Sequence, residues 1–382
     1  MSPNAREVLH SVFTEDLAGL RTRALGPLDF PVSQCRGEGV SLTPLRVSSG
    51  VSPDSRLARP QSRERTKSRA GLLPSDWRCK PRDRWSAAPV AFAGFGWYSA
   101  RVERLDLTHF ASAIERGVDG IWRPPEAEAI SYPADGNDAC FAVEENSFWF
   151  NHRNAVLTAL IARYRDELGG APFADIGGGN GFVALAVEAL GIPTLLVEPG
   201  PQGARRAYDR GLASVVEGTL DSCQFRDGCL AGAGMFDVVE HIADDVGFLR
   251  ETRRALRPGG LLFVSVPAYP LLWSHEDTAA GHERRYTAAS MSRLLSDAGF
   301  EQCYLGHFFR PLPPLIGLLR ALPYRLGLAP AAPTAASVAR DHKPGVADRA
   351  IRALLAGEVA AVARGEELAF GGSILVAARR PR

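Results

Sequence analysis

The stretch from Phe173 to Val183 constrains the fold of this chain more than any other. It reads Phe-Ala-Asp-Ile-Gly-Gly-Gly-Asn-Gly-Phe-Val, so a short apolar segment runs into four glycines, and a helix-compatible run from Phe182 to Leu190 follows at once. Glycine adopts backbone angles closed to other residues and lets a ligand approach the main chain. A glycine turn between a strand and a helix also aims free N–H groups at that ligand. The stretch therefore predicts a binding site for a nucleotide-type cofactor.

The spacing of the glycines distinguishes between cofactors. In the dinucleotide fingerprint Gly-x-Gly-x-x-Gly, the third glycine lets helix and strand pack closely. Counted from Gly177, that position falls on Phe182, which is too large. The pattern that fits is Asp175-x-Gly-x-Gly-x-Gly181, and the next apolar run, from Leu195, ends in the carboxylate of Glu198. A carboxylate at the end of that strand can accept hydrogen bonds from both ribose hydroxyls of a cofactor.

These motifs resemble the first two of the class I S-adenosylmethionine (SAM) methyltransferases. Further stretches match the family in order, namely 215–220, 230–235, 236–241 and the Arg257-Pro-Gly-Gly turn that leads into 261–267. The resemblance covers residues 110–382 and is most specific over 171–301. It implies an α/β, Rossmann-like fold, with a seven-stranded, mostly parallel sheet, helices on both faces and an antiparallel last strand.

The resemblance also implies which residues hold SAM. The glycines and the acid before them shape the pocket, Glu198 holds the ribose, and two residues after the third strand flank adenine. The implied cofactor residues are Asp175, Gly177, Gly178, Gly179, Gly181, Glu198, Thr219, Leu220 and Asp237. On the helix that precedes the first motif, Trp149 is a candidate cation–π partner of the sulfonium or adenosyl group, and Arg153 a candidate partner of the methionine carboxylate. The alternative is that this helix start packs on the core.

Composition and charge exclude several classes of protein. The formal net charge is +1, which gives no global attraction to nucleic acid or membranes. The six cysteines form no Cys-x-x-Cys pair, which favours reduced thiols over a disulfide or metal set, so no metal ligand is predicted. The chain starts without an apolar signal core and has no uninterrupted apolar run of 18 residues. A cytoplasmic protein without a membrane span is expected.

Two regions with different composition divide the chain. Residues 1–105 include a stretch rich in Ser, Pro and Arg that cannot bury enough apolar surface to fold, so a disordered segment is expected there. An alternative is that this region reflects an upstream start and is not part of the functional protein. The methyltransferase domain is expected over 106–382, with its core at 171–301, an insertion at 310–345 and a final helix and strand at 346–380.

Local patterns predict several helices of that domain. Phe110, Ile114 and Val118 are four residues apart, which predicts one helix ending at Gly120. Ser147 is a candidate N-cap for a helix that runs through 157–168, and Thr287 for one that ends at Gly299. A further helix is predicted over 346–363, with an apolar side made of Ile351, Leu354, Leu355, Val359 and Val362.

Three histidines are candidate catalytic bases. His241 follows the predicted fourth strand, while His275 and His282 follow the fifth, and open α/β sheets bind ligands beyond the carboxyl ends of their strands. Arg284 and Arg285 precede a helix N-terminus, where positive charge opposes the helix dipole. Either they serve an anionic ligand or they belong to a solvated loop.

The expected function is transfer of a methyl group from SAM to O or N of a small-molecule acceptor, polar or linked to a sugar or lipid. The apolar segment 310–330 is a candidate lid, a weak peripheral membrane contact, or a plain packed insertion. One alternative is a non-catalytic SAM-binding or scaffold protein, and another is an NAD-binding oxidoreductase, which Phe182 disfavours. A nucleic-acid acceptor is not expected because 110–382 shows no basic face, and the sequence sets no oligomeric state.

Overall fold

The computed structural model describes residues 105–126, 141, 144, 147–328 and 346–382. All of them belong to one compact unit of the chain. The predictions for residues 1–104, for the turn-rich loop at 130–137 and for the second half of the insertion, 329–345, lie outside the described residues.

One mixed sheet runs through the described part of the chain. Its spatial order is β1-β2-β5-β4-β3-β6-β7-β9-β8. The strands are β1 Glu115–Arg116, β2 Trp122–Arg123, β3 Phe173–Ile176, β4 Thr194–Glu198, β5 Val215–Glu217, β6 Leu230–Phe236, β7 Leu256–Pro267, β8 Glu301–Phe308 and β9 Ser373–Arg379. Five neighbouring strands, in the order β5, β4, β3, β6 and β7, are mutually parallel. β9 lies between β7 and β8 and is antiparallel to both. This confirms the predicted fold, to which the short β1–β2 pair adds an edge beside β5.

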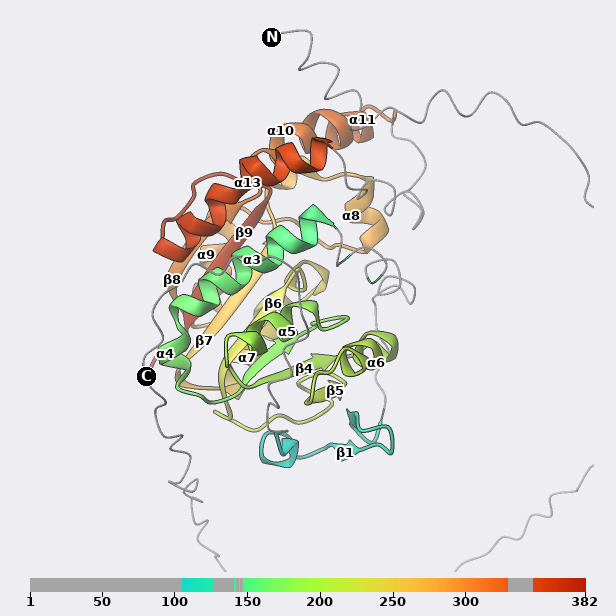
Figure 1. Ribbon diagram of the computed structural model, residues 1–382, viewed down its shortest axis with the longest axis vertical. Coiled ribbons are helices and arrows are strands. Elements are labelled where there is room, and N and C mark those ends of the chain that lie inside the picture. The colour runs from blue at the N-terminus through green and yellow to red at the C-terminus, as the bar shows by residue number, and fades with distance from the viewer. Residues whose placement is uncertain (1–104, 127–140, 142–143, 145–146, 329–345) are drawn as a thin grey trace, which may run out of the picture. The chain divides into compact units, whose positions relative to one another are not determined.

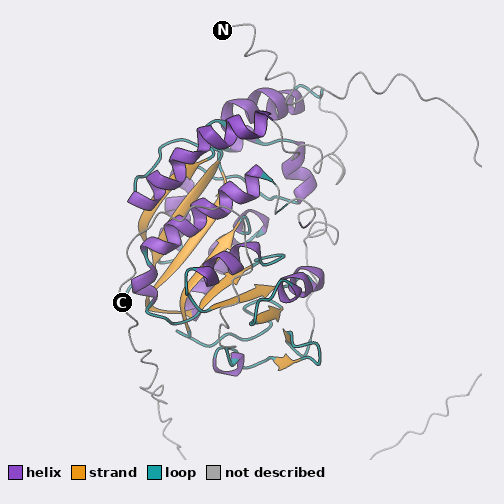
Figure 2. Cartoon of the chain, in the orientation of Figure 1, coloured by secondary structure: helices purple, strands orange, loops and turns teal. Residues whose placement is uncertain are grey.

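Helices alternate with the strands, as Figure 2 shows. They are α3 Phe148–Arg163, α4 Arg165–Leu168, α5 Phe182–Ala189, α6 Pro201–Asp209, α7 Asp245–Ala255, α8 His275–Ala280, α9 Ala288–Asp297, α10 Leu312–Ile316, α11 Leu322–Arg325 and α13 Val346–Arg364. Both predicted N-caps are confirmed, because the Ser147 hydroxyl accepts from the Trp149 amide and the Thr287 hydroxyl from the Ser290 amide. Within the described residues, no helix is both long and apolar enough to cross a membrane.

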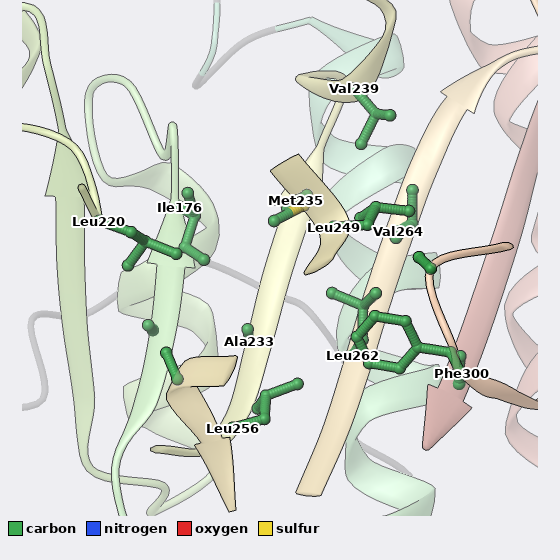
Figure 3. Close-up of a cluster of buried hydrophobic side chains, with 14 of the residues drawn as sticks. Ile176, Leu220, Ala233, Met235, Val239, Leu249, Leu256, Leu262, Val264 and Phe300 are labelled. Atoms are coloured by element: carbon green, nitrogen blue, oxygen red, sulfur yellow. The ribbon is translucent and has the colours of Figure 1, made fainter. Parts of the chain in front are cut away.

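Side chains of β3, β6, β7 and β9 alternate between two apolar clusters, one on each face of the sheet, and Leu196 of β4 and Val215 of β5 belong to a third. Phe173 and Phe263 belong to a cluster with α3, α5 and α13, and α3 lies against α13 (Figure 1). The neighbouring residues Ala174, Leu262 and Val264 belong to the opposite cluster, with α7 and α9 (Figure 3). Successive residues of a strand point to opposite faces, and every residue of β3, β4 and β6 is buried because helices cover both sides of the sheet.

The predicted helix over residues 110–120 is wrong. A 3-10 turn, Leu107–His109, and the β1–β2 pair occupy this region. Phe110 and Ile114 pack against the core, but Val118 is fully exposed at the turn between the two strands. That turn contains Asp119-Gly120, and the Asp119 carboxylate accepts two hydrogen bonds from Arg123 at 2.9 and 2.8 Å. Asp-Gly is a strong hairpin signal, and here it outweighs apolar residues four apart.

The prediction for α13 needs one correction, at Leu354. Leu355 and Val362 are fully buried, and Ile351 and Val359 pack against the same cluster, whereas Leu354 is 69% exposed. Leu354 is next to Leu355, so it lies about 100° away around the helix and misses the buried side.

Candidate active site

The glycine turn joins β3 to α5 at the carboxyl end of the central strand. The φ angle is +68° at Gly177, +53° at Gly179 and +77° at Gly181, a region that side chains with a Cβ rarely adopt. A Cβ at Gly177 would lie 2.8 Å from Val238, and one at Gly178 would lie 2.3 Å from Leu196. The turn therefore brings bare backbone to the carboxyl edge of the sheet, the cradle that a nucleotide-type cofactor needs.

Glu198, at the end of β4, is bound to that turn. Its Oε2 accepts from the Gly179 amide at 2.9 Å, and its Oε1 accepts from the Gly200 amide at 2.8 Å. The side chain is only 6% exposed. A carboxylate offers several acceptor positions, which is the chemistry that a ribose diol requires. The predicted role of Glu198 therefore fits its position, which the turn fixes.

Two further acids and one arginine lie beside the turn. Arg153, from α3, forms an ion pair with Asp237 at the end of β6 and donates to the Phe236 carbonyl at 2.6 Å. Burial, followed by the effect of Glu198, raises the pKa of the fully buried Asp175 to about 7, while the charge of Arg153 opposes this rise. Arg153 thus joins α3, β3 and β6 at the predicted cofactor site, with Asp237 as its partner.

The remaining predicted cofactor residues show how the site borders the core. The Trp149 ring stacks on Phe309, with centroids 5.5 Å apart, and the Arg153 guanidinium lies 5.6 Å from its centroid. Thr219 forms a turn with Ser222. Leu220 is buried and points toward Ile176 in the core (Figure 3). The structure thus gives Trp149 and Leu220 core contacts, and their roles toward SAM stay predictions.

A second group of polar residues lies past the ends of β6 and β7. The rings of His241 and His282 meet edge to face, with centroids 4.8 Å apart. His282 Nδ1 lies 2.9 Å from Asp277 Oδ1, and Arg285 binds both Asp277 oxygens at 2.6 and 3.0 Å. Burial and the nearby His282 lower the pKa of His241. Two of the three candidate bases are therefore adjacent, and the environment of His241 favours its neutral form.

The third candidate, His275, lies apart from this pair. Its ring contacts Tyr324 of α11, with centroids 5.8 Å apart. Arg284 and Arg285 each pair with an acidic side chain, and both line an open pocket that Asp245 also borders. Arg284 binds Asp245 at 2.8 Å, as Arg285 binds Asp277. Both arginines thus fix acidic side chains within the protein.

Sequence reasoning missed the roles of Glu240 and Asp277. Glu240 is fully buried next to His241, and burial followed by the nearby Asp237 raises its pKa well above the usual range. Asp277 holds the ring of His282 in place. The signal for Glu240 was an acid directly before a candidate base. For Asp277 the only signal was an acid five residues before a histidine, which many loops contain by chance.

Comparison with known proteins identifies this arrangement. Residues 149–304 match a methyltransferase domain family. The chain carries a methyltransferase domain. A protein of Mycolicibacterium smegmatis, named a probable S-adenosylmethionine-dependent methyltransferase, is 28% identical over 185 residues, which is 47% of this chain and 69% of that protein. A ubiquinone biosynthesis O-methyltransferase of Xanthomonas oryzae is 31% identical over 107 residues, 26% of this chain and 45% of that enzyme.

Among solved structures, the phosphoethanolamine N-methyltransferase 2 of Haemonchus contortus in complex with S-adenosyl-L-methionine aligns with a TM-score of 0.44 and 16% identity. The alignment covers 68% of this chain and 61% of that protein. The family match and the curated relatives identify the domain as a SAM-dependent methyltransferase. The glycine turn, Glu198 and the Arg153–Asp237 pair lie together in this domain, and their roles toward SAM stay predictions.

Proposed function

We propose that this methyltransferase transfers the methyl group of SAM to a hydroxyl oxygen of a small-molecule acceptor. The observation that carries the proposal is the His241–His282 pair, with the His282 ring held by Asp277. A hydroxyl is a weak nucleophile until it loses its proton, so its methylation calls for a group that removes that proton. A neutral amine needs such help less, because its lone pair is already free.

The position of the pair relative to the cofactor site supports this role. The loop after β6 carries Asp237, the partner of Arg153, and Val238, which packs against the glycine turn at Gly177. Two and three residues farther along, the same loop carries Glu240 and His241. One loop thus reaches from the proposed SAM site to the histidine pair, which is where an acceptor must meet the methyl group.

The chemistry divides between the cofactor and the chain. When bound, SAM supplies an activated methyl group, and the acceptor oxygen forms the new C–O bond as the C–S bond breaks and its electron pair stays on sulfur. The chain then has to align the two reactants and help the hydroxyl proton to leave. The glycine turn, Glu198 and Arg153 are proposed to orient SAM, and the histidine pair to activate the acceptor. The O-methyltransferase named among the relatives is in keeping with an oxygen acceptor.

An apolar part on the acceptor is favoured by the segment from α10 to α11. Arg320 in this segment forms an ion pair with Glu276 of α8 at 3.3 Å, and Tyr324 contacts His275, so the segment packs against α8, the helix whose Asp277 holds His282. Its exposed leucines are Leu318, Leu319, Leu322, Leu326 and Leu328. An acceptor that carries a hydrocarbon or lipid portion would find apolar surface there, as would the edge of a membrane.

The test combines cofactor titration with paired acceptors. Calorimetric titration of the full chain with SAM is expected to show one site that the Glu198→Ala variant weakens, and no comparable signal with NAD. Acceptor preference is then measured with hydroxyl compounds and their amine counterparts, each with and without an alkyl chain, using methyl-labelled SAM. Methylation of the amines but not of the hydroxyls would overturn the oxygen assignment, and failure to bind SAM would restore the scaffold alternative.

A further inference from the structure

The buried carboxylate of Glu240 is the starting point for a second assignment. The residue is fully buried, and neither side-chain oxygen has a hydrogen-bond partner within the described residues. The positively charged Arg153 and Arg285 interact electrostatically with the Glu240 carboxylate. Their hydrogen bonds go instead to Asp237 and Asp277. A buried carboxylate without a partner is costly to keep, so such a group points to a ligand.

Two imidazoles face the same point. One candidate ligand atom from each of Glu240, His241 and His282 lies within 4.8 Å of the other two. Two ligands on opposite sides of a cation at ~2.1 Å would be ~4.2 Å apart, so small side-chain movements would bring all three within bonding distance. Two histidines and one carboxylate that leave other positions open are a ligand set for divalent transition metals.

The hydrogen-bond partners of the His241 and His282 rings hold them in the way that metal-binding histidines are usually held. Asp277 can only accept, since it also binds Arg285 through both oxygens, so His282 Nδ1 carries the hydrogen and Nε2 keeps its lone pair. His241 hydrogen-bonds to the backbone of Gly281. Metal-binding histidines typically donate their second ring N–H to a carboxylate or a carbonyl. Both histidines therefore meet this condition, through residues that do not themselves reach the metal position.

We propose that Glu240, His241 and His282 bind a divalent metal ion at the acceptor end of the site. The ion would take the acceptor hydroxyl as a further ligand. With the ion bound, the two histidines would serve as its ligands and not as bases: the cation would let the hydroxyl release its proton to water, and the oxygen would then attack the methyl carbon as the C–S bond breaks. This role for the ion rests on the proposed methyl transfer to oxygen, whereas metal binding itself does not. Sequence analysis did not predict a metal site because these ligands lie on two loops separated by β7.

The test measures metal binding without any acceptor. The full chain and its variants are dialysed against ZnCl2, and bound zinc is determined by mass spectrometry. We expect one zinc per chain in the wild type and at least ~30-fold weaker binding in Glu240→Gln and His282→Ala. His109→Ala, an exposed histidine outside the cluster, serves as the matched control and retains binding. Cys303→Ser shows whether the exposed thiol contributes, and is also expected to retain the ion.

The outcomes separate this proposal from the proposed function. Circular dichroism verifies that each variant is folded, and SAM titration is run on the same samples. No zinc bound by the wild type, or equal binding by wild type and the two ligand variants, would overturn the metal site even if SAM still binds. Loss of zinc binding in the ligand variants with SAM affinity retained would support it. If SAM does not bind while zinc does, the proposed function fails and the metal site stands.

Discussion

The proposed cofactor side and the proposed acceptor side of this site are built in different ways. The glycine turn and Glu198 lie within one continuous segment, residues 173–198, and contact each other through Gly179. The acceptor side brings together Glu240 and His241 from one loop with Asp277 and His282 from another. The first side depends on backbone shape and the second on the exact placement of side chains. The two sides should therefore fail differently when residues are changed.

The largest effect is expected from Gly177→Val. A valine would have to hold φ near +68° and would place its Cβ 2.8 Å from Val238, so the turn cannot keep its shape. We expect SAM affinity to fall at least ~100-fold in calorimetric titration. Gly170→Val is the matched control, since Gly170 has φ +69° but nothing within 4 Å of its Cβ position. Equal SAM affinities in the two variants would show that the turn does not cradle the cofactor.

Substitutions on the proposed acceptor side should lower the rate of methyl transfer and leave the affinity for SAM unchanged. His282→Ala is expected to lower the methyl transfer rate ~100-fold, the scale of one group that helps to move a proton, with SAM affinity unchanged. His275→Ala should lower the rate by at most ~5-fold, because His275 contacts Tyr324 and not the histidine pair. Rates with methyl-labelled SAM would check both values. A larger loss in His275→Ala than in His282→Ala would move the acceptor site to α8.

Arg153 links the two sides, and its removal should have a moderate effect. Arg153→Met removes the partner of Asp237 and the positive charge near Asp175. We expect SAM affinity to fall ~20-fold, on the scale of a lost charge-assisted contact. Arg163→Met lies on the same helix but changes only an exposed contact with the Ala363 carbonyl, so it should bind SAM like the wild type. Unaltered binding by Arg153→Met would rule out a role for this arginine in the cofactor site.

The smallest effect is one on stability, at Asp175. Its pKa of about 7 in the folded protein lies above its ordinary value of 3.8, so the folded state binds more protons between these values, and this carboxyl becomes less favourable to folding as pH rises through that window. Asp175→Asn removes this penalty. We expect it to be more stable than the wild type above pH 7, and this advantage to disappear as the pH falls toward 4. Urea unfolding across this pH range measures the difference, and a gain independent of pH would contradict the assignment.

The same contrast explains how much the sequence predicted. β3, β4 and the glycine turn were placed correctly because apolar runs and glycine spacing are local signals. The predicted helix over 110–120 was wrong because Phe110 and Ile114 pack against the core from the chain around the β1–β2 pair, while Val118 lies exposed in the turn between those strands. His241 and His282 were identified as candidates, but their adjacency and the role of Asp277 depend on where two loops meet, which no local pattern encodes. Glu240 was missed as a site residue since burial of an unpaired acid is visible only in three dimensions.

The position of β9 has a consequence for the order in which this protein is synthesised. Residues 373–379 insert between β7 and β8, both of which leave the ribosome earlier. Until β9 emerges, the edge of β7 has no partner on that side and β8 has none to join it to the sheet. Nascent chains at this stage carry an open strand edge, the kind of surface that chaperones cover and that associates with other chains. Folding of this half of the sheet therefore waits for β9 to be translated.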